Sequence, residues 1–72
     1  MYKSADIAAS DWSYITIIHD LGHNPVFVLA TPISNTIGRF TWKINHDEYG
    51  ITIAIYNMEN SIMNIGFYIF AC

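Results

Sequence analysis

Charged side chains are scarce in this sequence, and basic ones most of all. Asp, Glu, Lys and Arg make up only 12% of the 72 residues, with three basic residues against six acidic ones and a net charge of −3. Nucleic-acid binding depends on clustered Lys and Arg that neutralise phosphates, and no such stripe is present. We therefore expect no nucleic-acid partner.

Cysteine and long apolar runs are also lacking. The only cysteine, Cys72, excludes an internal disulfide. Residues 1–11 hold no apolar segment of the kind that marks a secretory signal, so synthesis in the cytosol is the default expectation. The longest apolar run, residues 25–33, is interrupted by Thr31 and Pro32 and is far shorter than the roughly 20 residues of a membrane helix. Membrane insertion is not expected.

Strong helix formers are nearly missing, which indicates an all-β fold. The chain has no Gln and few Leu, Glu, Lys and Arg, but it has thirteen Ile and many Thr, Tyr and Phe. Hydrophobic residues reach 53%. A domain this small hides only about 60% of the surface of its unfolded chain, so a monomer cannot cover all these side chains. We expect a homo-oligomer.

Period-two alternation predicts about five strands in a small antiparallel β-sandwich or meander, completed by homo-oligomerisation. Residues 1–11 carry little pattern and are predicted to be an N-terminal arm or linker, while residues 12–72 form the β-sandwich module. Connections of about four to seven residues fit antiparallel pairing, without a parallel crossover. The expected strands cover residues 12–19, 26–31, 38–45, 51–56 and 62–71.

The faces of these strands differ in character. Strands 12–19 and 26–31 are apolar on both faces, which predicts burial on two sides. In strand 38–45, Trp42 is in phase with its apolar neighbours and is predicted to be core, whereas Arg39 and Lys43 lie on a solvated face.

One local motif stands out between the first two expected strands. Asp20 is expected to accept backbone N–H bonds within the turn, and Gly22 to adopt a positive φ. Leu21 is expected to close the end of the core, and Pro25 to open the next strand where no ladder donor is needed. His19 is expected to be a hydrogen-bonded structural residue; a metal site formed by copies of His19 around a symmetry axis is the less favoured alternative.

This motif resembles the small β modules that end many bacteriophage tail fibres and related receptor-binding proteins. The matching stretch is YITIIHDLGHNPVFVLATP, and FTWKIN, GITIAIYN and IGFYIFA follow in the same strand order. The resemblance covers about residues 12–72. It implies a homotrimer that serves host attachment as a virion protein, is made in the host cytoplasm, and contacts a cell-surface glycan or protein receptor.

Candidate ligand contacts are Tyr49 and Tyr56, whose rings near loops can stack on sugars, and the loop histidines His23 and His46. The acidic pair Asp47–Glu48 has the composition of a solvated turn, and its catalytic use is not favoured. No nucleophile elbow or triad pattern and no metal-ligand spacing is present. We therefore expect no enzyme activity, no metal and no cofactor.

Two alternative functions remain open from the sequence. The chain can be a free-standing carbohydrate-binding, lectin-like domain that acts outside a virion. It can also be a small effector or inhibitor that binds a host protein through an exposed edge strand.

Overall fold

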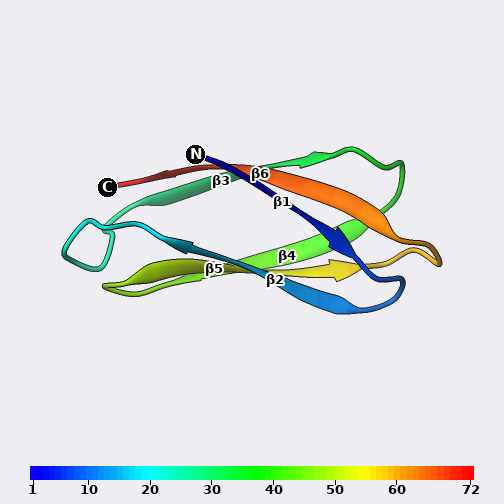
Figure 1. The fold of residues 1–72 in the computed structure, drawn as a ribbon, viewed down its shortest axis with the longest axis horizontal. Coiled ribbons are helices and arrows are strands. Elements are labelled where there is room, and N and C mark those ends of the chain that lie inside the picture. Colours follow the sequence, from blue (N-terminus) through cyan, green and yellow to red (C-terminus); the bar gives the residue numbers. More distant parts are fainter.

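Alternating Ile, Thr and aromatic residues form six strands and no helix in the computed structural model, which describes residues 1–72. The strands build two three-stranded antiparallel sheets that face each other (Figure 1). We name them sheet A, in the order β1-β6-β3, and sheet B, in the order β2-β5-β4. The predicted all-β sandwich is confirmed, with one strand more than expected. The strands are β1 (Tyr2–Ile7), β2 (Trp12–Ile18), β3 (Val28–Ser34), β4 (Phe40–His46), β5 (Gly50–Asn57) and β6 (Met63–Ala71).

The additional strand, β1, lies in the segment that was predicted to be an arm or linker. Its residues pair with β6 from Tyr2 opposite Tyr68 to Ile7 opposite Met63. Ile7 is fully buried, and Ala5 packs against the core. The prediction for residues 1–11 is therefore wrong for this strand, because two small or apolar residues facing inward are too few to produce a visible alternation.

The connections divide the molecule into two ends. Only β4 and β5 form a hairpin; the other connections pass from one sheet to the other, so the arrangement is a sandwich and not a meander. The β2–β3 loop (residues 19–27) and the β4–β5 turn (residues 47–49) lie together at what we call the hairpin end (Figure 1). The remaining three connections lie at the opposite, crossover end.

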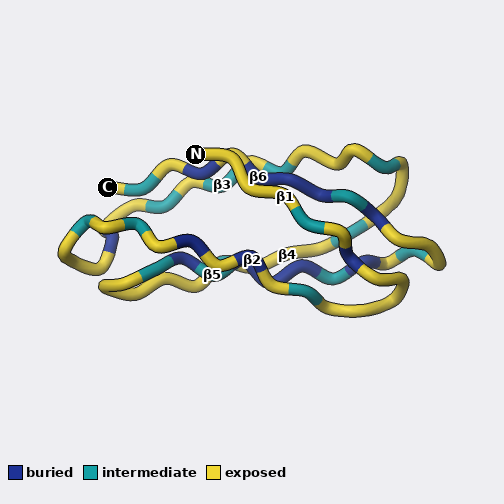
Figure 2. Tube along the Cα trace, in the orientation of Figure 1, coloured by how far each residue is buried: buried dark blue, intermediate teal, exposed yellow.

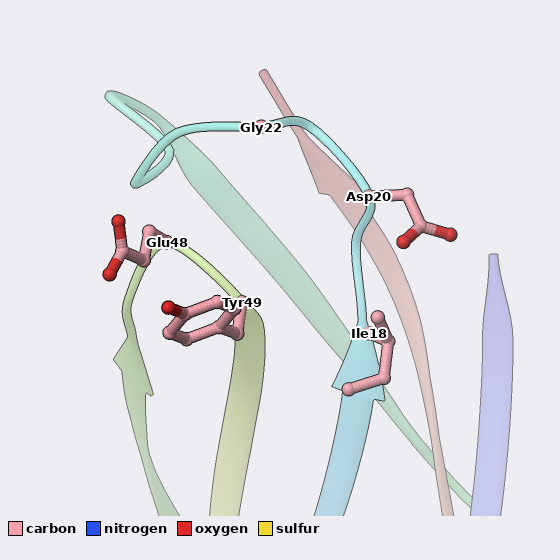
Figure 3. A pocket seen from close by; sticks show the side chains of 5 residues that line it. All are labelled: Ile18, Asp20, Gly22, Glu48 and Tyr49. Atoms are coloured by element: carbon pink, nitrogen blue, oxygen red, sulfur yellow. The ribbon is translucent and has the colours of Figure 1, made fainter.

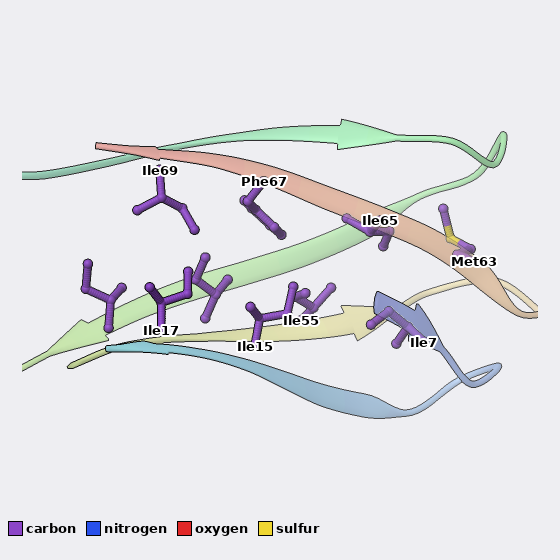
Figure 4. Packing of buried hydrophobic residues seen from close by; sticks show 10 residues of the cluster. Ile7, Ile15, Ile17, Ile55, Met63, Ile65, Phe67 and Ile69 are labelled. Carbon is purple, nitrogen blue, oxygen red and sulfur yellow. The ribbon is translucent and has the colours of Figure 1, made fainter. Parts of the chain in front are cut away.

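The core lies between the two central strands, β5 and β6 (Figure 4). Their inward side chains are almost completely buried, which appears as the long buried stretches in Figure 2. Each central strand has a neighbouring strand on both sides within its sheet and the other sheet across its inner face, so its inward side chains are shielded from solvent. The core cluster consists of Ile7, Ile15, Ile17, Ile51, Ile53, Ile55, Met63, Ile65, Phe67 and Ile69.

Strand β3 corrects the expectation of two-sided burial. It is an edge strand, and none of its residues is fully buried. It begins at Val28, so Pro25 does not open it, and it continues past Pro32 to Ser34. A proline fits there because an edge strand needs hydrogen bonds on one side only.

Trp42 faces inward as predicted but is not sealed in the core. Its ring lies 5.8 Å from that of Phe67, centre to centre, yet 37% of the residue remains exposed. The cause is position: β4 is the edge of sheet B, where no further strand covers the outer side of the ring.

The structure contains no helix that is long and apolar enough to cross a membrane.

A buried amide holds the crossover end together. The Nδ2 of Asn57 donates to the carbonyl oxygens of Ile7 (3.0 Å) and Ser61 (2.7 Å), and its Oδ1 accepts the N–H of Glu59 (2.8 Å). Its backbone N–H donates to the carbonyl of Asp11 (3.0 Å). One side chain therefore satisfies polar groups that burial would otherwise leave unpaired.

We expect Asn57→Ala to lower the free energy of unfolding by about 2–3 kcal/mol, because buried backbone groups lose their partners. Urea unfolding followed by tryptophan fluorescence measures this loss. Asn60→Ala is the control, since Asn60 is exposed at the same end and should change stability by less than about 0.5 kcal/mol. Equal effects of both substitutions would contradict the role of Asn57.

Candidate functional site

The β4–β5 turn at the hairpin end is organised by Asp47. Its Oδ1 accepts the backbone N–H groups of Tyr49 (2.8 Å) and Gly50 (2.9 Å), and its own N–H donates to the carbonyl of Gly50 (3.0 Å). The N–H groups of Gly50 and then Tyr49 are the main causes that hold the pKa of Asp47 below its usual range. The turn leaves Tyr49 71% exposed.

His19 fastens the neighbouring β2–β3 loop to this turn. Its Nδ1 accepts the N–H of Leu21 (3.1 Å), so the neutral ring carries its proton on Nε2. Nε2 then donates to the carbonyl oxygen of Asp47 (2.7 Å). The position is that of a structural histidine, with both ring nitrogens engaged.

A second imidazole holds the loop further along. The Nδ1 of His46, at the end of β4, donates to the side-chain oxygen of Asn24 (2.5 Å). His23 lies in the same loop with its Nδ1 directed to the carbonyl of Asn24 (3.0 Å). His19 of the loop and His46 of β4 therefore fix the loop against the hairpin.

The turn motif differs in part from expectation. Asp20 accepts no hydrogen bond from the turn; instead it adopts a positive φ of 54°, which Asp tolerates better than most residues. Gly22 has the expected positive φ, 78°. Leu21 is only half-buried and does not join the core cluster, whereas Pro25 is buried within the loop.

Between loop and hairpin lies one shallow, open pocket of about 400 Å³ (Figure 3). Ile18 and the ring of Tyr49 contribute apolar surface, and Asp20 and Glu48 contribute carboxylates. Gly22 completes the lining. Of these residues the sequence predicts Tyr49 alone as a ligand contact; it predicts Asp20 and Gly22 as turn residues and gives no ligand role to Ile18 or Glu48.

The other predicted ligand residues divide between the two ends. His23 and His46 lie at the hairpin end but do not line the pocket. Tyr56 is six residues along β5 from Gly50, roughly 20 Å away at 3.3 Å per residue. It packs on the outer side of sheet B with its ring 5.2 Å from that of Trp12, and so does not join the site.

The pocket has the chemistry to hold a neutral, hydroxyl-rich ligand. The two carboxylates can accept hydrogen bonds from hydroxyl groups, and the exposed Tyr49 ring offers a flat apolar surface. With a net charge of −3 on the chain, anionic ligands are disfavoured. No group of three or more His, Cys, Asp or Glu side chains is arranged to hold a metal ion.

Comparisons of the chain with protein-family models, with curated proteins and with solved structures find no significant match.

Acidification should weaken the hairpin through Asp47. The pKa of Asp47 is lower in the folded chain than in the unfolded chain, so the ionised carboxylate stabilises the fold above the unfolded value, about 3.9, and this stabilisation is lost as the pH falls through the folded value. Asp47→Asn keeps an acceptor oxygen but removes the charge.

The measurement is the melting temperature of both proteins from neutral pH to below pH 3. The wild type should be the more stable at neutral pH, and the difference should shrink below about pH 4. Glu48→Gln serves as control, because the Glu48 carboxylate accepts no turn N–H. A pH-independent difference between wild type and Asp47→Asn would argue against this role.

Proposed function

We propose that the chain is a non-enzymatic attachment module that assembles into a homotrimer and binds a neutral cell-surface carbohydrate at its hairpin end. The single observation that carries the ligand part is the pocket in which the exposed Tyr49 ring lies with Asp20 and Glu48 (Figure 3). The resemblance to fibre-tip modules adds the context: a phage tail fibre whose receptor-binding tip contacts the host.

The geometry favours a sugar over a large apolar ligand. The pocket is open and shallow, and its walls combine one aromatic ring and one aliphatic side chain with two carboxylates. A pyranose presents C–H groups on one face and hydroxyl groups around its edge, which match a tyrosine ring and carboxylate acceptors. Such a site gives specificity through a few polar contacts.

The loops that carry these groups are held in place before a ligand arrives. His19 ties the β2–β3 loop to Asp47 of the hairpin, and His46 at the end of β4 holds Asn24 of the same loop. Pre-organised loops lose less conformational entropy on binding, so even a small contact area retains useful affinity.

Affinity per site is expected to be weak because the pocket covers one or two sugar rings at most. Several copies on one assembly would raise the apparent affinity by avidity, provided that their pockets reach the same surface. The exposed apolar side chains of the single chain, including Leu29 and Phe70, support such an assembly.

The test is glycan-array screening followed by titration calorimetry with the best neutral oligosaccharide. We expect Tyr49→Ala to weaken binding at least about tenfold through loss of the stacking surface. Asp20→Asn should weaken it as well while preserving the positive φ at that position.

Tyr56→Ala is the matched control, since Tyr56 is a tyrosine of the same strand pair at the opposite end. Binding that is lost with Tyr56→Ala and kept with Tyr49→Ala would place the site elsewhere. An array without any binder would remove the ligand part of the proposal.

A further inference from the structure

The outer face of sheet A, which we call the A face, leaves large apolar side chains in solvent. Its exposed members come from all three strands and from the loop before β3: Tyr2, Phe27, Leu29, Ile33, Tyr68 and Phe70. Figure 2 shows β1 and β3, in the upper layer, as mostly exposed or intermediate along the tube. Monomeric proteins rarely expose a large continuous apolar patch, so this face requires an explanation.

These side chains form one continuous band across the sheet. Leu29 lies opposite Phe70, and Phe27 packs against Phe70 with ring centres 6.3 Å apart. Tyr68 stacks on Tyr2 at 4.8 Å. The Tyr2 ring also covers Gly66, where any Cβ would collide with the tyrosine hydroxyl. The band is therefore continuous over β1 and β6, and Thr31, opposite Tyr68, is the one polar side chain between Leu29 and Ile33 on β3.

The area is large enough for an interface. Aromatic side chains have surfaces of roughly 150–250 Å², so the six residues together expose on the order of 500–600 Å². Two such faces would bury about 1,000–1,200 Å² before their polar margins are counted, which is close to the roughly 1,200 Å² where stable interfaces begin. The outer face of sheet B is different, since the polar row Thr16, Thr52 and Asn45 crosses it.

Charge on the A face is confined to one end. Its only charged side chain is that of Asp6, which accepts a hydrogen bond from Asn64 (2.9 Å) near the crossover end. Phe27, Leu29 and Phe70 lie at the hairpin end. The face thus has a polar end and an apolar end.

We propose that the A face is covered by the A faces of further copies of this chain, related by a rotation axis that runs along the strands. This deepens the proposed self-association by naming its surface, and it does not depend on the ligand. A copy of the same face fits because the apolar band needs no opposite charge on its partner.

The direction of the axis follows from the polar and apolar ends. An axis along the strands places apolar end on apolar end and Asp6 beside polar neighbours. An axis across the strands, with the faces fully overlapped, would lay the polar end of one copy, which holds Asp6 and Asn64, over the apolar end of the next, and this would cost desolvation of the polar groups. A rotation axis along the strands also places the Tyr49 pockets of all copies at the same end of the assembly, as avidity requires.

The first experiment measures assembly by light scattering and sedimentation at micromolar concentration. The wild type should be oligomeric, and Phe70→Lys should raise the dissociation constant by about 30-fold or more. The matched control is Tyr14→Lys on the outer face of sheet B; Tyr14 is 65% exposed and Phe70 is 58% exposed. Tyr14→Lys should leave assembly unchanged.

A monomeric wild type, or dissociation by Tyr14→Lys but not by Phe70→Lys, overturns the assignment of the face. If Phe70→Lys does not fold by circular dichroism, Leu29→Lys replaces it, because Leu29 is 52% exposed on an edge strand. Persistent assembly without any sugar binding would refute only the proposed ligand, so the two failures are distinguishable.

The second experiment tests the axis with spin labels and pulsed dipolar spectroscopy. One label is placed on the exposed thiol of Cys72, at the hairpin end; the other on Asn60→Cys in a Cys72→Ser background, at the crossover end. With the axis along the strands, both labels should lie within about 30 Å of their counterparts. If either pair is further apart than about 30 Å, the length of β6, the proposed axis is wrong.

Discussion

The contact between β5 and β6 is the constraint on which the rest of the molecule depends. They are the only strands with hydrogen-bonded neighbours on both sides, and their inward side chains, Ile53 and Phe67 among them, are fully buried. A chain of 72 residues can bury the contact between these two strands, but it has too few residues to cover the edge strands as well. The edge strands therefore keep part of their apolar surface in water, as Trp42 shows. The exposed A face follows from the same shortage.

The pocket and the A face use different parts of the scaffold. The pocket depends on two loops at the hairpin end, joined by His19 and His46, whereas the A face depends on side chains that point outward from sheet A. Each can be altered without disturbing the core, because neither contributes to the β5–β6 contact. A scaffold built in this way can keep one interior while the side chains of the pocket and of the A face vary separately.

Alternation predicted β2, β5 and β6 well, because only one phase of a period-two pattern buries a complete row of Ile. It missed β1, where Ser4 and Asp6 face outward and leave Ala5 and Ile7 as the only inward signal. The residues of the pocket were predicted in part. Tyr49 was found because it lies in a polar turn, but Ile18 and Glu48 come together only through the pairing of β2 with β5, which no local pattern records. The same register carries Tyr56 to the far end.

The few cations of this chain have a consequence for its solubility. Of the four edge strands, β1 carries Lys3, β4 carries Lys43 and β3 lacks a backbone donor at Pro32, whereas β2 carries neither a charge nor a proline. Charges and prolines on edges obstruct the strand-by-strand growth that leads to amyloid-like fibrils. A polypeptide with thirteen Ile and little charge is otherwise at high risk of such growth. Three of its four edges thus oppose open-ended growth, and β2 is the edge at which such growth would begin.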